Sequence, residues 1–400
     1  MTLSSQAANK GPQPVSHLTV NGRVEVTRPV YAATGGGTSV PLDEWLGIAS
    51  SRVSVGAREL CCRATMAGGS FCTASETVER LAQIRVGHEQ VRRLTEAEGR
   101  AVTAAIEAGS VGPDWTAADC RVTPEGPTRV MVGCDGVQVP VVTAAEKAKR
   151  RANRRARRKT RRRRTKGRRA ARPRRCRGSD EKFREFKIAT FYDDSKEHQY
   201  AIGTAGNHDV LGYRMRHEAA KLKIDEAQEK VAISDGAEWI PHQLRTRLPM
   251  VHVHILDYYH LMEHVGQAAA VCFGEGTEAA AAWRDASSAA VMEEGGSGLL
   301  AKIAETRRTV RAGGKREALR KLEQYVAKRI ERVDYPAFRA QGFDIGSGPT
   351  EALCKTLTAR LKGSGKRWDR PNAEAIMALA ALQQSHLWNT YWAQQRRGVA

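Results

Sequence analysis

The sequence predicts an α/β protein in which a mixed five-stranded sheet with flanking helices is interrupted by a helical insertion and preceded by a helical region. Short β-branched runs of period two alternate with helical segments over 123–273. Helical periodicity occupies 46–122, and an Ala-rich, charged block fills 274–340. At 400 residues, the chain is long enough for two or three domains. We therefore expect a flexible tail at 1–45 and the final helices of the catalytic domain at 341–400.

Composition favours a soluble intracellular protein. Hydrophobic residues make up 41% of the chain and charged residues 27%, and no apolar run approaches the ~18 residues that a membrane span needs. The opening MTLSSQAANKGPQPVSHL lacks a basic and then apolar signal pattern. The eight cysteines show no CxxC pair, which predicts buried thiols instead of disulfides or structural zinc. We expect a cytoplasmic, nucleoid-associated protein without membrane contact.

The N-terminal part divides into a Gly-, Ser-, Thr- and Pro-rich segment and a helical one. Over 1–45 we expect a flexible tail or weakly held strands. Within 46–122, two helices are separated by a break at 85–87, and Thr73 or Ser75 is expected to cap the first. A second helix carrying Arg92 and Arg93 fits a helix-turn-helix that binds DNA. A helical bundle with exposed charges is the alternative.

The order of elements from 123 to 273 defines the sheet. RVMVGCDGVQV, FREFKIATFYDD and HQYAIGTAG are three strands, a helix follows, and KVAISDGA and VHVHILD are two further strands separated by a short helix. A helix starting in YYHLMEHV follows the last strand. This is the order of a ribonuclease-H-like fold, in which the first and fourth strands lie side by side. Asp135 and Asp235 would then be neighbours.

Three acids in separate segments form the candidate catalytic site. Asp135 and Asp235 each stand near the end of a strand before a glycine, and Glu351 opens a helix in DIGSGPTEALCKTL. Clustered carboxylates repel one another and are commonly neutralised by hard divalent cations, here two Mg²⁺ or Mn²⁺ ions. Such a pair promotes phosphoryl transfer. Taken singly, the aspartates also fit Asp-Gly turns and Glu351 an ordinary helix start.

Two further residues could support this site. Asp257 and His260 in LDYYH follow the fifth strand and would lie beside Asp235. They could orient metal-bound water or DNA. A helix-capping aspartate and a partly buried histidine are the alternative interpretation.

The net charge of +21 is concentrated in one stretch. Residues 147–177 hold 20 Lys or Arg and no acid, which leaves 45 Lys or Arg against 44 Asp or Glu elsewhere. We expect a disordered arm that binds polyanions without sequence preference and has helical propensity at its start. The predicted DNA-binding residues of this arm are Arg161, Arg162, Arg163 and Arg164. Those that follow Glu351 are Lys355, Arg360, Lys362, Lys366, Arg367 and Trp368.

Five ordered passages carry a family resemblance over roughly 125–392. They are VGCDGVQV, EFKIATFYD, ISDGAEWI, HILDYYHLMEHV and IGSGPTEALCKTLTARLKGSGKRW, followed by HLWNTYW. The chain resembles bacterial insertion-sequence DDE transposases and is most similar to the Kra-type insertion-sequence group. The resemblance implies a ribonuclease-H-like nuclease and strand transferase with metal ligands at Asp135, Asp235 and Glu351. The Arg-rich stretch departs from the family pattern, in which the link after the first Asp is short.

The expected function is therefore DNA transposition. The resemblance implies Mg²⁺-dependent cleavage at the element ends and strand transfer into target DNA, with terminal inverted repeats and target DNA as partners. Synapsis of two ends favours a homodimer or a higher oligomer. A non-catalytic nucleic-acid-binding protein and a ribonuclease-H-like nuclease that cuts without joining are the alternatives.

Overall fold

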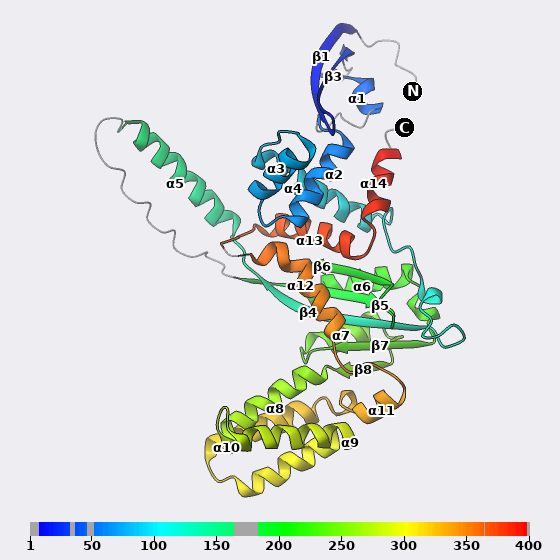
Figure 1. Ribbon diagram of the computed structural model, residues 1–400, viewed down its shortest axis with the longest axis vertical. Coiled ribbons are helices and arrows are strands. Elements are labelled where there is room, and N and C mark those ends of the chain that lie inside the picture. Colours follow the sequence, from blue (N-terminus) through cyan, green and yellow to red (C-terminus); the bar gives the residue numbers. More distant parts are fainter. Residues whose placement is uncertain (1–7, 33–36, 46–51, 164–182, 364, 398–400) are drawn as a thin grey trace. The chain divides into compact units, whose positions relative to one another are not determined.

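The computed structural model describes residues 8–32, 37–45, 52–163, 183–363 and 365–397 (Figure 1). The chain forms two compact units. Unit 1 comprises Met1–Gly112, Gln138–Arg184 and Thr356–Ala400, and unit 2 comprises Pro113–Val137 and Glu185–Lys355. The expected catalytic domain from 341 to 400 is thus divided, because residues from 356 onward belong with the N-terminal helices.

Unit 1 begins with a β-hairpin, so the described part of 1–45 forms the strands that we gave as the alternative to a flexible tail. Strands β1 (Asn9–Thr19) and β2 (Gly22–Ala32) pair antiparallel, and a short β3 (Thr38–Ser39) pairs with β2. Helix α1 (Pro41–Trp45) follows. Leu18 is only 2% exposed and packs in the core of the helices that follow, and its backbone also bonds to the segment before α2. This tertiary anchor explains why a Gly- and Pro-containing segment is ordered as strands.

Three helices follow the hairpin. They are α2 (Val55–Ala67), α3 (Phe71–Ala82) and α4 (His88–Glu107). The expected break at 85–87 is confirmed, but the cap of α3 is Ser70, whose Oγ accepts the Thr73 N–H at 3.0 Å. The expectation of Thr73 or Ser75 at that position is wrong. Ser70 directly precedes Phe71, the first residue of the helix, and has an extended backbone, which is the position and the conformation of an N-cap residue.

The C-terminal helices complete unit 1. Helix α13 (Arg370–Gln384) lies against α4, and a methyl group built on Gly99 would approach the Ala375 carbonyl oxygen to 2.1 Å. Helix α14 (Trp388–Arg397) packs on α2, where Trp388 Nε1 donates to Glu59 at 3.0 Å. These contacts explain why the last helices belong to unit 1.

The start of the Arg-rich stretch is a helix. Helix α5 (Ala144–Arg163) includes residues 147–163, for which we expected disorder, and the rest of the stretch lies outside the described residues. Ala, Arg and Lys have high helix propensity, and no Gly or Pro occurs between the start of the helix and position 164. The helix also has an ion pair at its first turns, because Arg150 Nε donates to Glu146 at 2.8 Å.

Unit 2 contains the predicted mixed sheet. Its strands are β4 (Arg129–Val139), β5 (Arg184–Tyr192), β6 (Gln199–Thr204), β7 (Glu229–Ser234) and β8 (Val253–Leu256). They run in the order β6-β5-β4-β7-β8. Strands β5 and β6 are antiparallel, whereas β4, β7 and β8 are parallel neighbours. The expected adjacency of the first and fourth strands is confirmed.

Helices connect and extend the sheet. Those between and after the strands are α6 (His208–Lys221), α7 (Trp239–Arg247) and α8 (Tyr258–Phe273). The expected insertion is helical and consists of α9 (Glu278–Thr309), α10 (Gly313–Ala327) and α11 (Tyr335–Ala340). Its apolar residues share a core with Ile233 and Ile255 of the sheet, so the insertion is packed onto unit 2. Helix α12 (Gly348–Lys362) comes next.

The state of the cysteines and the hydropathy of the helices can be stated for the described residues. None of their cysteines forms a disulfide, and all except Cys72 are buried, as the composition predicted. Among the described helices, none combines the length and hydropathy that a bilayer crossing requires.

Candidate active site

Asp135 and Asp235 lie next to each other at one position of two parallel strands. The register pairs Cys134 of β4 with Ser234 of β7, so the next residue of each chain segment is an aspartate. Both carboxylates are half-buried. In parallel neighbours the equivalent residues lie side by side, and here they are the two predicted acids. Asp235 directly follows the end of β7, but Asp135 lies inside β4, which continues to Val139, so its expected place near a strand end is wrong.

Glu351 reaches the same part of unit 2 because a glycine in β4 lets helix α12 approach the sheet. Thr350, which is 1% exposed, lies so near Gly133 that a methyl group there would be 1.8 Å from the Thr350 Oγ1. The Thr350 hydroxyl is also 3.2 Å from that of Thr190 on β5. Glu351 follows in the first turn, is exposed, and accepts a 3.1 Å hydrogen bond from Ser347 Oγ. We call Asp135, Asp235 and Glu351 the carboxylate edge.

The electrostatics of Asp135 show that these acids influence one another. Its pKa is raised above the ordinary value, first by burial and then by repulsion from Asp235 and Glu351. The Gly136 N–H donates to Asp135 at 2.6 Å and opposes this rise. Like charges without a cation between them favour the protonated form. Burial and the two neighbouring acids therefore disfavour the ionised form of Asp135.

The fit to metal ions is partial. Carboxylate oxygens are the ligands that Mg²⁺ and Mn²⁺ prefer. Yet in the described part of the chain no three His, Cys, Asp or Glu side chains converge closely enough to hold a metal ion. The carboxylate oxygens suit these ions, but Glu351 does not lie close enough to the two aspartates to form a three-ligand site with them. Two metal ions at this edge therefore stay a proposal.

Asp257 links the elements that carry the acids. It caps helix α8 by accepting the His260 N–H at 2.6 Å, and its other oxygen accepts the Ser347 N–H at 2.5 Å. Its own N–H donates to the Ser234 carbonyl oxygen at 2.9 Å. Asp257 is 1% exposed. It joins the end of β7 to the residue before α12.

His260 is partly buried and contacts other side chains of α8. Its Nδ1 is 3.6 Å from Glu263, and its ring packs edge-on against His264. The helix cap and the partly buried histidine of the alternative interpretation are thus present. The bond from Ser347 to Asp257 had no sequence signal because the two residues are far apart in the chain.

The helical insertion contributes two residues that sequence reasoning missed. Arg329 Nη2 donates to the Gly236 carbonyl oxygen at 2.6 Å, directly after Asp235, and its guanidinium lies 4.0 Å from the ring centroid of Tyr325. The Tyr325 hydroxyl is buried without a hydrogen-bond partner among the described residues, and a methyl group on Gly236 would lie 2.1 Å from it. Burial raises the pKa of Tyr325 to about 12, so the hydroxyl keeps its proton.

Another acid that we did not predict lies beside Asp135. A methyl group on Gly136 would come within 2.0 Å of Glu185 Oε1 on β5. Glu185 is paired with Lys187 at 2.6 Å, and Lys187 in turn lies over the ring of Trp239. The sequence shows Glu185 and Lys187 alternating in REFKI. The position of Glu185 beside Asp135, however, follows only from the pairing of the strands.

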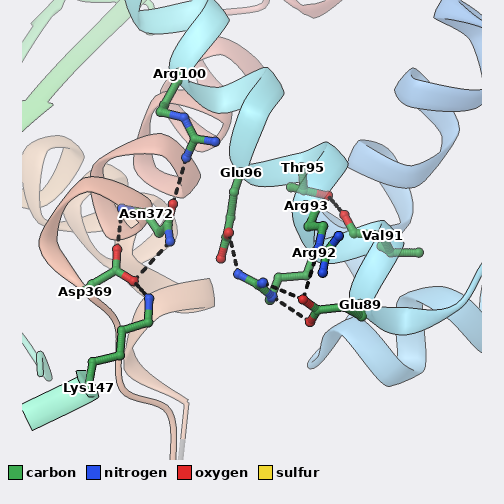
Figure 2. Close-up of polar contacts among 10 residues, drawn as sticks. All are labelled: Glu89, Val91, Arg92, Arg93, Thr95, Glu96, Arg100, Lys147, Asp369 and Asn372. Carbon is green, nitrogen blue, oxygen red and sulfur yellow. Dashed lines mark hydrogen bonds and ion pairs between the residues drawn. The ribbon is translucent and has the colours of Figure 1, made fainter. Parts of the chain in front are cut away.

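The predicted DNA-binding residues differ in their surroundings. Lys355 and Lys362 are exposed on α12. Arg92 is tied to Glu89 and Glu96, and Arg93 is exposed beside Glu89 (Figure 2). The paired state of Arg92 differs from that of a helix-turn-helix side chain free to meet DNA. The side chains of Arg161, Arg162 and Arg163 and the whole of Arg164 lie outside the described residues.

The remaining predicted residues, Arg360 and 366–368, gather in unit 1. Arg360 and Trp368 are buried at 6% and 7% exposure, Lys366 is half-buried, and Arg367 is exposed. The indole N–H of Trp368 donates to the Leu361 carbonyl oxygen at 3.2 Å. Little of the Trp368 ring is therefore open for a base to stack on.

Comparison with known proteins gives only distant structural likenesses. No protein-family profile and no curated protein matches the sequence. The structure is similar to that of the Drosophila P element transposase strand transfer complex, with a TM-score of 0.29 and 11% sequence identity. The match covers 86% of this chain and 82% of that chain. At this TM-score the likeness carries no argument about fold or function.

Proposed function

We propose that this chain is a DNA transposase whose unit 2 is a ribonuclease-H-like catalytic domain with Asp135, Asp235 and Glu351 as its acidic triad. The observation that carries the proposal is the parallel register of β4 and β7, which brings Asp135 and Asp235 together. The raised pKa of Asp135 supports a role for Glu351 at the same place, because Glu351 contributes to it. The resemblance to insertion-sequence transposases supplies the reaction.

The chain's own residues have distinct tasks in this proposal. Asp135 and Asp235 would hold the metal ions, and the exposed Glu351 side chain would complete the ligand set. Bound Mg²⁺ or Mn²⁺ would activate the attacking oxygen and stabilise the leaving oxygen of the phosphodiester. Lys355 is exposed one turn after Glu351 on the same helix face, where it contacts a phosphate of the substrate. The partners are the terminal inverted repeats and target DNA, bound by an oligomer.

The experiment is incubation of the full chain with Mg²⁺ and DNA that carries the flanking inverted repeats, scored separately for nicking and for joining. We expect both products for the wild type. Asp135→Asn, Asp235→Asn and Glu351→Gln should lose both. Asp285→Asn is the matched control, because Asp285 is an exposed acid on α9 with a side chain that is 71% exposed. Undiminished cleavage by any triad variant would remove that residue from the triad.

A second candidate is a nucleic-acid-binding protein without catalytic activity. It is favoured by the lack of a three-ligand cluster among the described residues. In that case DNA is bound but neither nicked nor joined in Mg²⁺ or Mn²⁺, and the triad variants bind as the wild type does. A product that is nicked but never joined would instead indicate a nuclease.

A further inference from the structure

Unit 1 contains a pocket of about 630 Å³ that the carboxylate edge does not involve. Its walls come from the start of α3, the first turns of α4 and α5, and the segment 365–369. Val141 pairs with Trp368 in an isolated bridge, and the Val142 N–H donates to the Trp368 carbonyl oxygen at 2.8 Å. These bonds fix the start of α5 beside the segment. We call this cavity the basic pocket.

The acids that line the basic pocket already have cationic partners. Arg92 bridges two of them, at 2.7 Å from Glu89 and 2.6 Å from Glu96 (Figure 2). The third, Asp369, is paired with Lys147. Burial opposes ionisation of Asp369, but Lys147 and the hydrogen bonds from Asn372 together lower its pKa. No lining carboxylate is left over for the other cations.

Among the cations that line the basic pocket, Arg360 has the most unusual surroundings. It is 6% exposed and lies between two aromatic rings, 4.8 Å from the centroid of Phe71 and 5.5 Å from that of Trp368. Its Nε donates to the Thr65 carbonyl oxygen at 3.2 Å, but its Nη2 is buried without a hydrogen-bond partner among the described residues. A buried guanidinium normally has a carboxylate or another acceptor for each donor. The Nη2 donor of Arg360 has no such acceptor among the described residues.

Lys366 is a second cation that contacts Arg360. Lys366 Nζ donates to the Arg360 carbonyl oxygen at 3.1 Å. Burial lowers the pKa of Lys366, and repulsion from Arg360 lowers it further. On the open side, Arg151 and Arg154 of α5 are exposed one turn apart and also line the pocket. Among the described residues none of these four has a carboxylate partner.

We propose that the basic pocket binds the backbone of a DNA strand, with one phosphate held by Arg360 and Lys366 and its neighbours along α5 by Arg151 and Arg154. The assignment to DNA rests on the proposed function. A strand suits the pocket better than a free phosphate because the volume is that of a site for a ligand of nucleotide size. The exposed arginines of α5 then meet successive phosphates, which a single ion does not supply.

The first experiment measures binding of a fluorescent single-stranded DNA 20-mer to the full chain by anisotropy, in EDTA, over a range of salt concentrations. Lys366→Gln combined with Arg367→Gln removes two pocket cations, and we expect roughly tenfold weaker binding or more. The slope of log K against log salt should fall by about 0.7 for each phosphate that the variant no longer neutralises. Arg80→Gln is the matched control, since Arg80 is exposed on α3 outside the pocket. Equal weakening in control and pocket variants would overturn the proposal.

The second variant tests Arg360 itself. Arg360→Met removes the charge but keeps a long side chain between the rings, so we expect an unchanged or raised Tm together with roughly tenfold weaker DNA binding. A lower Tm with unchanged affinity would show that Arg360 is structural. Competition separates the ligands: inorganic phosphate that displaces the 20-mer at low millimolar concentration, or tighter binding of the same sequence as RNA, would overturn the assignment to a DNA strand.

These measurements do not depend on catalysis. The binding assay contains no divalent metal ion, so it measures DNA binding without cleavage. If cleavage is absent but the pocket variants still weaken binding, the pocket proposal survives without the proposed function. If cleavage occurs but the pocket variants bind normally, the pocket proposal alone fails.

Discussion

The carboxylate edge of unit 2 and the basic pocket of unit 1 leave opposite charges without partners. At the first, burial and mutual repulsion raise the pKa of Asp135. At the second, burial without a nearby anion lowers the pKa of Arg360. Elsewhere the same protein neutralises buried charge: Arg129, 4% exposed, is 2.6 Å from Glu229 and 2.8 Å from Asp194. The contrast indicates that the two uncompensated regions are suited to ligands of opposite charge, cations at one and phosphates at the other.

The largest expected effect separates chemistry from binding. Asp235→Asn should lower the rate of DNA cleavage by about 10³-fold or more, because several kcal/mol of metal-assisted stabilisation disappear, while DNA affinity in EDTA is unchanged. Lys366→Gln with Arg367→Gln should do the reverse, raising the DNA concentration for half-maximal cleavage but leaving the saturated rate within about twofold. Single-turnover cleavage over a DNA titration measures both quantities. If both variants lower the same quantity, the two regions form one site and the comparison fails.

The next effect tests whether Asp257 positions the carboxylate edge. Asp257→Ala removes the cap of α8 and the acceptor for the Ser347 N–H, so we expect a loss of about 2 kcal/mol of stability and roughly 10- to 100-fold in cleavage rate. Asn207→Ala removes only the cap of α6, where Asn207 accepts the Val210 N–H at 3.0 Å, and should cost about 1 kcal/mol without a specific loss of activity.

The readout that decides is the Mg²⁺ concentration for half-maximal cleavage. It should rise in Asp257→Ala, since the start of α12 is less well held, and stay unchanged in Asn207→Ala. An unchanged Mg²⁺ dependence in both variants would make Asp257 a cap and nothing more.

Gly133 should affect the carboxylate edge because it lets helix α12 pack closely against β4. Gly133→Ala places a methyl group into Thr350, and we expect it to cost about 1 to 3 kcal/mol and to lower the cleavage rate by displacing Glu351. Gly266→Ala is the control: nothing lies within 4 Å of a methyl group there, so it should gain about 0.5 to 1 kcal/mol by helix propensity. Chemical denaturation and cleavage kinetics measure both. A Gly133→Ala protein of wild-type stability would mean that α12 is not held by this close approach.

Local sequence patterns predicted the order of strands and helices in unit 2 because each strand is a short β-branched run between turn residues. They also placed Asp135 and Asp235 side by side. For 1–45 they left a flexible tail and weakly held strands both open, because the order of the hairpin depends on the burial of Leu18 against α2. Nor did they predict that α13 joins unit 1, since the approach of Gly99 to Ala375 links residues far apart in the chain.

The candidate site shows the same limit. Glu351 was predicted as the third acid from its place in DIGSGPTEALCKTL and from the family resemblance, but the glycine that admits its helix and the bond from Ser347 to Asp257 are tertiary contacts. Arg360 was predicted as one of several cations after Glu351. Its distinguishing property is a buried donor without an acceptor among the described residues, which is a consequence of packing between Phe71 and Trp368 and has no signature in the order of residues.

The smallest expected effect is on stability and follows from the raised pKa of Asp135. A carboxyl whose pKa is higher in the folded than in the unfolded state stabilises the fold at low pH, and this stability is lost as the pH rises through the folded-state pKa. In EDTA, Asp135→Asn should therefore be more stable than the wild type at pH 7, by on the order of 1 kcal/mol. The advantage should shrink towards acid pH and vanish below the ordinary carboxyl value of 3.8. Urea unfolding at several pH values measures the difference, and saturating Mg²⁺ should stabilise the wild type more than the variant. An advantage of Asp135→Asn that is the same at every pH would mean that repulsion among the acids is not its origin, and the carboxylate edge would lose its contrast with the basic pocket.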